Sequence, residues 1–134
     1  MANRKRNSLT FLDLSYNTDL IHLDGLETLC NLSTLDLMFS SVTGVEPLSA
    51  CTNLGVLYIN STKVRDLTPL STLLKLKVFD ISYLALTSNL LPLQNCPIER
   101  LYCSGYPENE VMAMAILFPD AAIMQGDQEW SGSE

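Results

Sequence analysis

A hydrophobic motif of the form L-x-x-L-x-L, with close variants, returns five times along the chain at an almost constant interval. The copies begin at positions 9, 32, 54, 76 and 98, so the steps between them are 23, 22, 22 and 22 residues. Such a period is the signature of a protein built from stacked structural repeats. A single repeat of this size cannot bury its own apolar side and is stable only against its neighbours. The interval therefore predicts a solenoid.

The segment 54–75 shows what each repeat is expected to form. Residues 56–60 alternate, with Leu57 and Ile59 on one side, and this period of two predicts a short strand. Beyond the strand, apolar residues recur at every third position, namely Val64, Leu67, Leu70 and Leu73. That spacing is typical of a 3₁₀ helix, and Pro69 suits its first turn. Strand and return segment are expected to face one slab of core.

Two units, D-L-T-P-L-S-T-L at 66–73 and V-T-G-V-E-P-L-S-A-C at 42–51, resemble the 22-residue class of leucine-rich repeats. That class occurs in the leucine-rich regulatory subunit of protein phosphatase 1, in a dynein light chain and in bacterial internalins. The resemblance covers residues 9 to about 125. It implies an α/β solenoid with a curved parallel sheet on the concave side and short 3₁₀ or helical segments and loops on the convex side. It implies little about function, because one scaffold serves many.

The loop position where this repeat class usually carries Asn varies along the chain. Its occupants are Asn17, Ser40, Thr62, Leu84 and Tyr106. Ser and Thr can still bond to the backbone, whereas Leu and Tyr are not expected to do so in the same way. The repeats are therefore predicted to become less regular towards the C-terminus.

The expected organisation has four segments: a disordered start at 1–8, repeats at 9–106, a capping helix and strand at 107–125, and a disordered tail at 126–134. A cap is expected because a bare terminal repeat exposes apolar core and unpaired strand groups. No comparable cover precedes the first strand. The chain is then the tail of a longer array, or its first edge pairs with another chain, or that edge is polar enough to be exposed.

Composition disfavours several kinds of partner. The formal net charge of -7 argues against general binding to nucleic acid. The longest apolar runs, such as 111–118, are far shorter than the roughly 20 residues of a membrane span. Three basic residues at 4–6 are not followed by the apolar stretch of a secretory signal.

Metal binding, cofactors and catalysis are also not expected. The four cysteines form no C-x-x-C pair, and His22 is the single histidine. Neither a G-x-S-x-G motif nor a glycine-rich phosphate loop occurs, and no small-molecule substrate is evident. An open face is expected to leave carboxyl pKa values unshifted. The cysteine usage suggests a reducing compartment, so a cytoplasmic location is predicted.

The candidate partner-binding residues are the strand positions whose side chains point away from the core. One row across the sheet is predicted to hold Asp13, Asp36, Tyr58, Asp80 and Tyr102, and the row beside it Phe11, Thr34, Val56, Val78 and Arg100. Met38 and Asn60 complete the set. Neighbours in a row should lie about 5 Å apart.

These rows predict a non-catalytic module that binds a partner protein on the concave face. Tyr is enriched at binding hot spots, and three Asp favour a partner with a basic or apolar patch. Charge reversal of Asp36 and Asp80 is then expected to weaken binding without lowering stability. Two alternatives stay open: these are ordinary solvated sheet residues, or the array is a structural or dimerising segment of a larger leucine-rich repeat protein.

Overall fold

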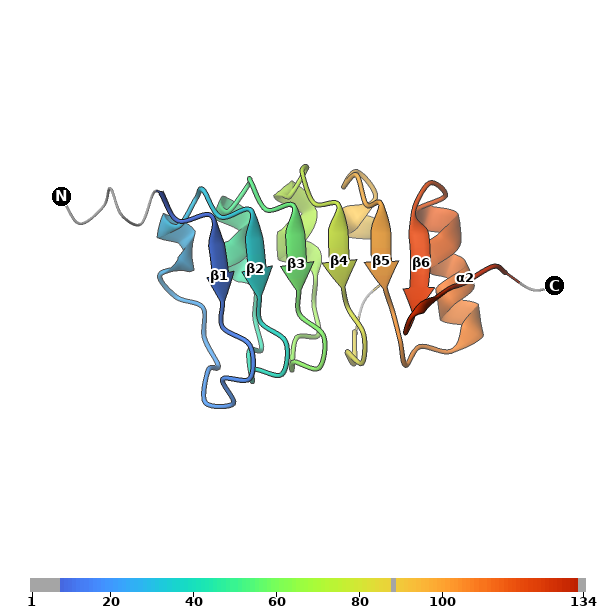
Figure 1. The fold of residues 1–134 in the computed structure, drawn as a ribbon, viewed down its shortest axis with the longest axis horizontal. Helices are drawn as coiled ribbons and strands as arrows, with labels where there is room; N and C mark the ends of the chain where they lie inside the picture. Colours follow the sequence, from blue (N-terminus) through green and yellow to red (C-terminus); the bar gives the residue numbers. More distant parts are fainter. Residues whose placement is uncertain (1–7, 88, 133–134) are drawn as a thin grey trace.

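The computed structural model describes residues 8–87 and 89–132 as a single row of parallel strands backed by short helices (Figure 1). The sheet follows chain order: β1 Phe11–Asp13, β2 Thr34–Asp36, β3 Val56–Tyr58, β4 Val78–Asp80, β5 Arg100–Tyr102, β6 Ala122–Gln125 and β7 Gln128–Glu129. Only β7 runs antiparallel to its neighbour. Behind the strands lie the 3₁₀ helices η1 Leu26–Thr28, η2 Glu46–Ala50, η3 Thr68–Thr72 and η4 Leu91–Leu93, and the α-helix α2 Glu108–Leu117.

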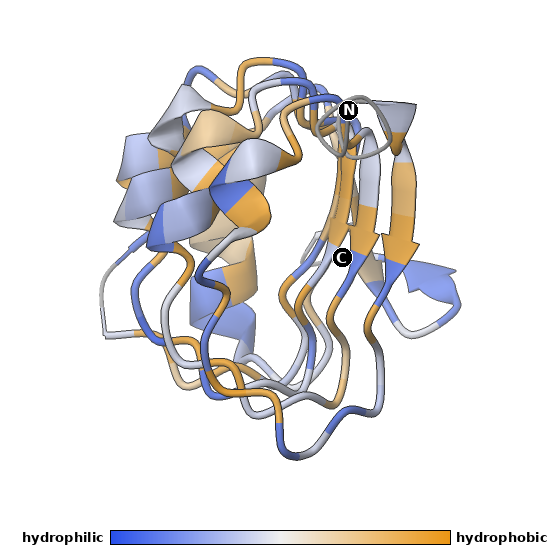
Figure 2. Ribbon diagram, turned by 90° about the vertical axis from the view of Figure 1, so that its left-hand side faces the viewer, coloured by the Kyte–Doolittle hydropathy of each residue, from blue (hydrophilic) through white to orange (hydrophobic). Residues whose placement is uncertain are grey.

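The end-on view of Figure 2 shows the sheet on one side and the helical layer on the other, and the buried side chains of the core lie between these two layers. The central residue of each strand points inward, and these residues pair in register as Leu12, Leu35, Leu57, Phe79 and Leu101. Repeats 2 to 5 bury these positions almost completely, and Leu12 in the first repeat is partly buried. The predicted leucine-rich repeat solenoid is confirmed.

The return segments form as their three-residue spacing predicts. Pro occupies one of the first two positions of η2, η3 and η4, where its missing N–H leaves no helical bond unmade. Leu48, Leu70 and Leu93 are the buried residues of these helices. Cys51, Cys96 and Cys103 are buried free thiols, and Cys30 is exposed.

The variable loop position is handled differently in different repeats. Asn17 and Thr62 each donate a side-chain hydrogen bond, at 2.8 Å, to the carbonyl three residues earlier. Leu84 cannot donate one, and the corresponding carbonyl of Ile81 instead accepts a 2.8 Å bond from the Tyr106 hydroxyl, one repeat further on. Tyr106 thus does not bond in the way that Asn17 and Thr62 do, as expected, but its length lets it reach back by one repeat and bond to the backbone there.

We expect Tyr106→Phe to lower the free energy of unfolding by about 1–2 kcal/mol. The change leaves the Ile81 carbonyl without that donor, and an unsatisfied buried acceptor costs more than an average hydrogen bond. Urea denaturation measures the loss. Tyr102→Phe is the matched control, because no hydrogen bond to the Tyr102 hydroxyl is present within 8–87 and 89–132. Equal stability of the two variants would show that the Tyr106 hydroxyl is not needed.

The C-terminal residues continue the sheet and cover its last repeat. Helix α2 buries Val111 and Met114 against the core, and β6 pairs with β5 in the same parallel register as the repeats. The chain then turns into β7, where the sequence predicts a disordered tail from residue 126. Trp130 donates its backbone N–H to the Ile123 carbonyl at 2.6 Å and packs on the core. Hydropathy misses β7 because its backbone bonds, rather than apolar side chains, hold it.

The N-terminal end differs from the C-terminal end. The motif leucines Leu9, Leu12 and Leu14 are only partly buried, whereas their equivalents Leu32, Leu35 and Leu37 are fully buried. Most of the segment predicted to be a disordered start, residues 1–7, lies outside the described residues. Among the described residues, the first repeat thus presents partly exposed core and an edge of β1 that no other strand pairs with.

Candidate functional site

The outward-facing rows predicted from the sequence lie side by side on the sheet. The strand row pairs residue by residue as Asp13, Asp36, Tyr58, Asp80 and Tyr102. The second row pairs in the same way as Phe11, Thr34, Val56, Val78 and Arg100. Met38 and Asn60 follow the strand row by two residues and do not belong to either row. We call the surface formed by these twelve residues the sheet face.

Exposure varies across the sheet face. Phe11, Asp13 and Arg100 are exposed, and the other nine predicted residues are half-buried. The half-buried residues occupy the middle of the array, where neighbouring strands shield one another. The central part therefore combines restricted water access with polar groups.

The aspartates of the strand row also hold the turns that follow their strands. In each case one carboxylate oxygen accepts the backbone N–H two residues later: Ser15 at 2.9 Å, Met38 at 3.0 Å and Ser82 at 2.9 Å. A local bond of this kind is a frequent reason for Asp at a turn. These bonds change the expectation that charge reversal of Asp36 and Asp80 leaves stability unchanged. Because Lys cannot accept them, we expect the reversal to lower stability.

Burial changes the acidity of two of these carboxyl groups. It raises the pKa of Asp36, and the negative charges of Asp13 and Asp80 raise it further, while the bond from Met38 opposes the shift. Burial likewise raises the pKa of Asp80. The expectation of unshifted values on an open face fails here, because neighbouring strand residues desolvate both groups. Asp13 is exposed, and the bonds from Ser15 lower its pKa.

We expect Asp36→Asn/Asp80→Asn to melt about 1–2 °C above the wild type at pH 7, a shift that a few tenths of a kcal/mol would produce. Asn keeps the acceptor oxygen and removes the charge. A carboxyl group whose folded pKa is raised stabilises the fold when protonated and loses that contribution as pH rises through its folded pKa. The gain should therefore disappear below pH 3.8, the ordinary value of both groups. Melting curves from pH 3 to 8 test this, and a gain independent of pH would contradict it.

The aromatic members of the strand row lie among these acids. Tyr58 sits between Asp36 and Asp80 in register, and Tyr102 lies beyond Asp80. Burial raises the pKa of the Tyr58 hydroxyl, with further contributions from Tyr102, Asp36 and Asp80. The central sheet face thus alternates carboxylate and phenol.

A third row borders the sheet face and was not predicted. Three residues after each member of the strand row the backbone turns through a positive φ, at Tyr16 (62°), Phe39 (59°), Ser61 (59°), Tyr83 (61°) and Gly105 (90°). We call these five residues the turn row. Tyr16, Phe39 and Tyr83 are 66%, 44% and 65% exposed. Large side chains rarely adopt a positive φ, and the hydropathy pattern carries no information about backbone φ. The sequence pattern D-x-x-aromatic recurs at 13–16, 36–39 and 80–83, and this pattern could have been used to predict the turn row.

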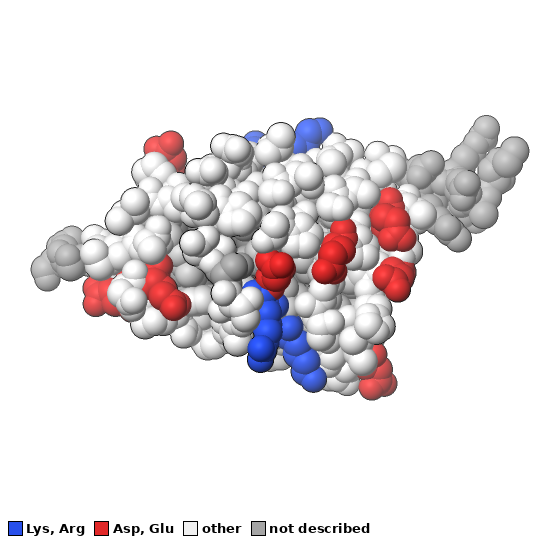
Figure 3. Space-filling model, turned by 180° about the vertical axis from the view of Figure 1, so that it is seen from behind, with Lys and Arg blue, Asp and Glu red and all other residues white. Residues whose placement is uncertain are grey.

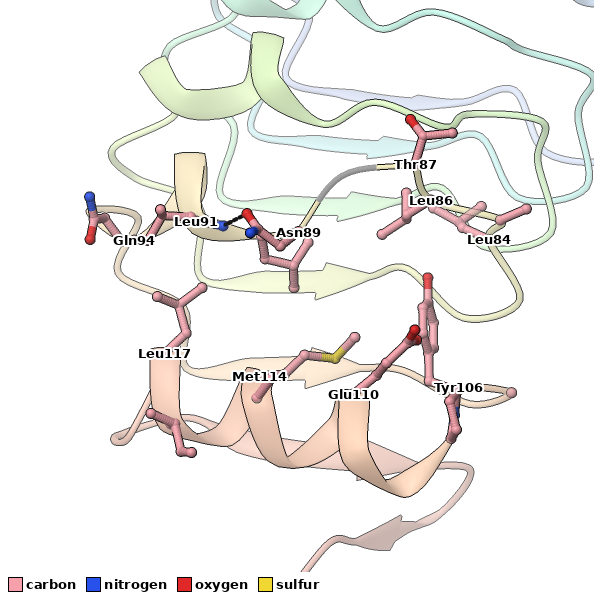
Figure 4. Close-up of a pocket in the computed structure, with 16 residues that line it drawn as sticks. Leu84, Leu86, Thr87, Asn89, Leu91, Gln94, Tyr106, Glu110, Met114 and Leu117 are labelled. Atoms are coloured by element: carbon pink, nitrogen blue, oxygen red, sulfur yellow. Dashed lines mark hydrogen bonds between the residues drawn. The ribbon is translucent and has the colours of Figure 1, made fainter.

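An apolar groove of about 900 Å³ opens between α2 and the loop that precedes η4 (Figure 4). Leu84, Leu86, Leu91, Met114 and Leu117 line it, together with Tyr106 and Glu110. Glu110 is the single charged residue among the described lining residues. The groove lies on the side opposite the strands, and the sequence did not predict it.

The rest of the described surface offers little chemistry. Figure 3 shows the convex side, where acidic and basic side chains are scattered over a largely uncharged surface. Within residues 8–87 and 89–132, no group of three or more His, Cys, Asp or Glu side chains could hold a metal ion. Among the helices described, none has the length and apolar character needed to cross a bilayer.

Comparison with known proteins supports the fold. No protein-family model matches the chain, and no curated protein sequence matches it. Several solved structures, however, match the chain. A leucine-rich repeat protein of Leptospira interrogans is 21% identical with a TM-score of 0.79 over 92% of this chain and 32% of that one. Internalin C2 of Listeria monocytogenes is 22% identical with a TM-score of 0.66 over 87% of this chain and 61% of that one.

A third structure, TLR13 in a complex with ssRNA13, is 22% identical with a TM-score of 0.66 over 89% of this chain and 18% of that one. The chain thus spans about a third, three fifths and a fifth of the three proteins. At these identities the comparisons show the leucine-rich repeat fold alone. The likeness to internalins has a counterpart among them, and the likeness to the phosphatase regulatory subunit stays a prediction. The exclusion of nucleic acid also stays a prediction.

Proposed function

We propose that the chain is a non-catalytic protein-binding module whose sheet face holds a partner protein. The observation that carries the proposal is the half-buried row of alternating acids and tyrosines at the centre of the sheet, in the register Asp36, Tyr58, Asp80 and Tyr102. Tyrosine supplies a large contact area at low entropic cost, and half-buried acids give charge selectivity. A partner with a basic or apolar patch fits this surface.

Site-specific photo-crosslinking in a lysate of the source cell tests the proposal. A photoreactive aromatic amino acid replaces Tyr58 on the sheet face or, as the matched control, Leu74, which is 59% exposed outside the sheet face. We expect protein adducts from position 58 that excess wild-type chain suppresses and excess Asp36→Asn/Asp80→Asn chain does not. Adducts that form equally well from position 74, or no adducts from position 58, would contradict the proposal.

A second function, a structural or dimerising segment, is favoured by the first repeat. Leu9, Leu12 and Leu14 stay partly exposed there, and β1 has no neighbour on its outer side within the described residues. An open strand edge of this kind readily pairs with another strand. Sedimentation over a hundredfold range of concentration separates the two functions. A concentration-dependent dimer that Leu12→Asp abolishes would support this function, and a monomer throughout would contradict it.

A further inference from the structure

Aromatic rings cross the array in a zigzag of two neighbouring rows. Repeats 1, 2 and 4 carry an acid in the strand row and a ring in the turn row, at Tyr16, Phe39 and Tyr83. Repeats 3 and 5 reverse the arrangement, with Tyr58 or Tyr102 in the strand row and a small residue in the turn row. Each repeat thus contributes one ring to the two rows together.

The row of rings at the turn is interrupted at Ser61. Tyr16 and Phe39 stack with ring centroids 5.1 Å apart and planes 6° from parallel, so one face of Phe39 is covered. Its other face lies toward repeat 3, whose turn residue Ser61 is too small to cover it. The ring of Tyr83 lies on the opposite side, towards Gly105 in repeat 5. Its Cδ1 atom is 2.6 Å from the position that a Cβ atom on Gly105 would occupy. We call this interruption, bounded by Phe39 and Tyr83, the Ser61 gap.

The width of the gap suits one planar group. Adjacent parallel strands lie about 4.8 Å apart, so the backbones at Phe39 and Tyr83, two repeats apart, are separated by roughly 10 Å, and the Tyr83 ring lies on the far side of its backbone from the gap. A planar group in contact with a ring on each side needs two contact distances of about 3.5–4.0 Å. A ligand plane therefore fits against the open face of Phe39 without displacing Tyr83.

Charge around the gap favours a cation. Tyr58 belongs to the same repeat as Ser61, and Asp36 and Asp80 flank it in register. Within residues 8–87 and 89–132 the one salt bridge joins Lys77 to Glu99, away from these acids. Each acid accepts the backbone N–H of its own turn through one oxygen, and Ser82 also bonds to Asp80 through its side chain. Burial raises the pKa of both, so their negative charge is destabilising until a cation offsets it.

We propose that the Ser61 gap binds an arginine side chain of the partner, with its guanidinium stacked on Phe39 and its positive charge attracted by Asp36 and Asp80. This inference rests on the proposed function and names the partner's recognition group. A guanidinium is planar, stacks on aromatic rings and presents several donors to carboxylates in a fixed fork. A lysine ammonium satisfies the charge but not the stacking. The occupant is therefore an arginine-bearing segment.

Peptide binding to the full chain tests this inference without knowledge of the partner. The probes are fluorescein-labelled Gly-Ser peptides with one central Arg, Lys or citrulline, whose side chain is the planar, uncharged analogue of arginine. Fluorescence anisotropy at low ionic strength reports the affinity. We expect the Arg peptide to bind roughly tenfold more tightly than the citrulline peptide and several-fold more tightly than the Lys peptide.

Two variants address the gap itself. Ser61→Tyr fills it, and the fold should accept the change because Tyr16, Phe39 and Tyr83 hold large rings at nearly the same φ as Ser61. Asp36→Asn/Asp80→Asn removes two charges and keeps both turn-holding acceptors. Each variant is expected to abolish the preference for Arg over citrulline. The matched controls are Asp19→Asn/Asp24→Asn, which removes two exposed loop charges, and Ser71→Tyr on η3; both should keep the preference.

Equal binding of the Arg and citrulline peptides, equal binding of Arg and Lys, or an unchanged preference in Ser61→Tyr would each overturn the inference. These outcomes differ from failure of the proposed function. If a partner binds the sheet face by other contacts, the crosslinks from position 58 would persist although the preference for the Arg peptide is absent. If neither the crosslinks nor the preference were observed, the sheet face would not be a binding site.

Discussion

Val111→Asp is expected to remove about 3–5 kcal/mol from the free energy of unfolding, enough to unfold much of the chain at 37 °C. Val111 is fully buried on the side of α2 that faces the core, and a carboxylate there would have no partner. Burying an unpaired charge is among the most destabilising single changes. Because a domain of this kind has about 5–15 kcal/mol in total, the helix would detach and expose the last repeat. Circular dichroism in urea measures the loss.

Ile116→Asp is the matched control on the same helix. Ile116 is 77% exposed, so the same substitution places its charge in water. Its effect should stay within about 0.5 kcal/mol. If Val111→Asp proved as stable as Ile116→Asp, α2 would not act as the cap of the array. This result would contradict the capping role predicted for residues 107–125.

Phe79→Ala is expected to cost about 3–5 kcal/mol, the range for removing a buried aromatic side chain. Phe79 is 1% exposed and stands at the centre of β4, where the other repeats carry Leu. In a solenoid each repeat contacts only its neighbours, so the resulting cavity would weaken both interfaces of repeat 4. Differential scanning calorimetry should show a lower melting temperature.

Phe11→Ala provides the comparison for a strand residue on the opposite face of the sheet. Phe11 is 59% exposed in β1, and its removal should change stability by no more than about 0.5 kcal/mol. A large loss with Phe11→Ala would mean that the sheet face contributes to the fold itself. It would then be a poor candidate for a partner surface.

The repeat period was enough to predict the fold. Once Leu12, Leu35, Leu57, Phe79 and Leu101 share one position in the motif, their strands must stack in register, and the outward rows follow from alternation. The strand row and the second row were predicted residue by residue for this reason. A shift of one residue would have turned every side chain to the wrong face.

Other features depend on geometry that hydropathy does not encode. The positive φ of Tyr16, Phe39 and Tyr83 follows from the turn and runs against the usual preference of large residues. The bond from Tyr106 to Ile81 spans 25 residues and depends on the length of one side chain. The shifted pKa values of Asp36 and Asp80 come from shielding by neighbouring strands, which a single repeat does not reveal.

The sheet face and the turn row retain features that stability alone would not select. Asp36 and Asp80 carry charges that burial makes unfavourable, and the turn row places large rings where glycine would be less strained. Costs of this kind are common where a surface is kept for binding rather than for folding. The same residues surround the Ser61 gap, so the proposed binding of a partner there would be linked to the stability of the free chain.

An ¹⁵N NMR titration of the full chain with the arginine peptide tests the sheet face most directly. The sheet face and its turn row predict amide shifts centred on Phe39, Tyr58 and Ser61, with the resonances of the α2 groove unchanged. Shifts confined to groove residues such as Leu86 and Met114 would contradict the assignment of the sheet face as the binding surface.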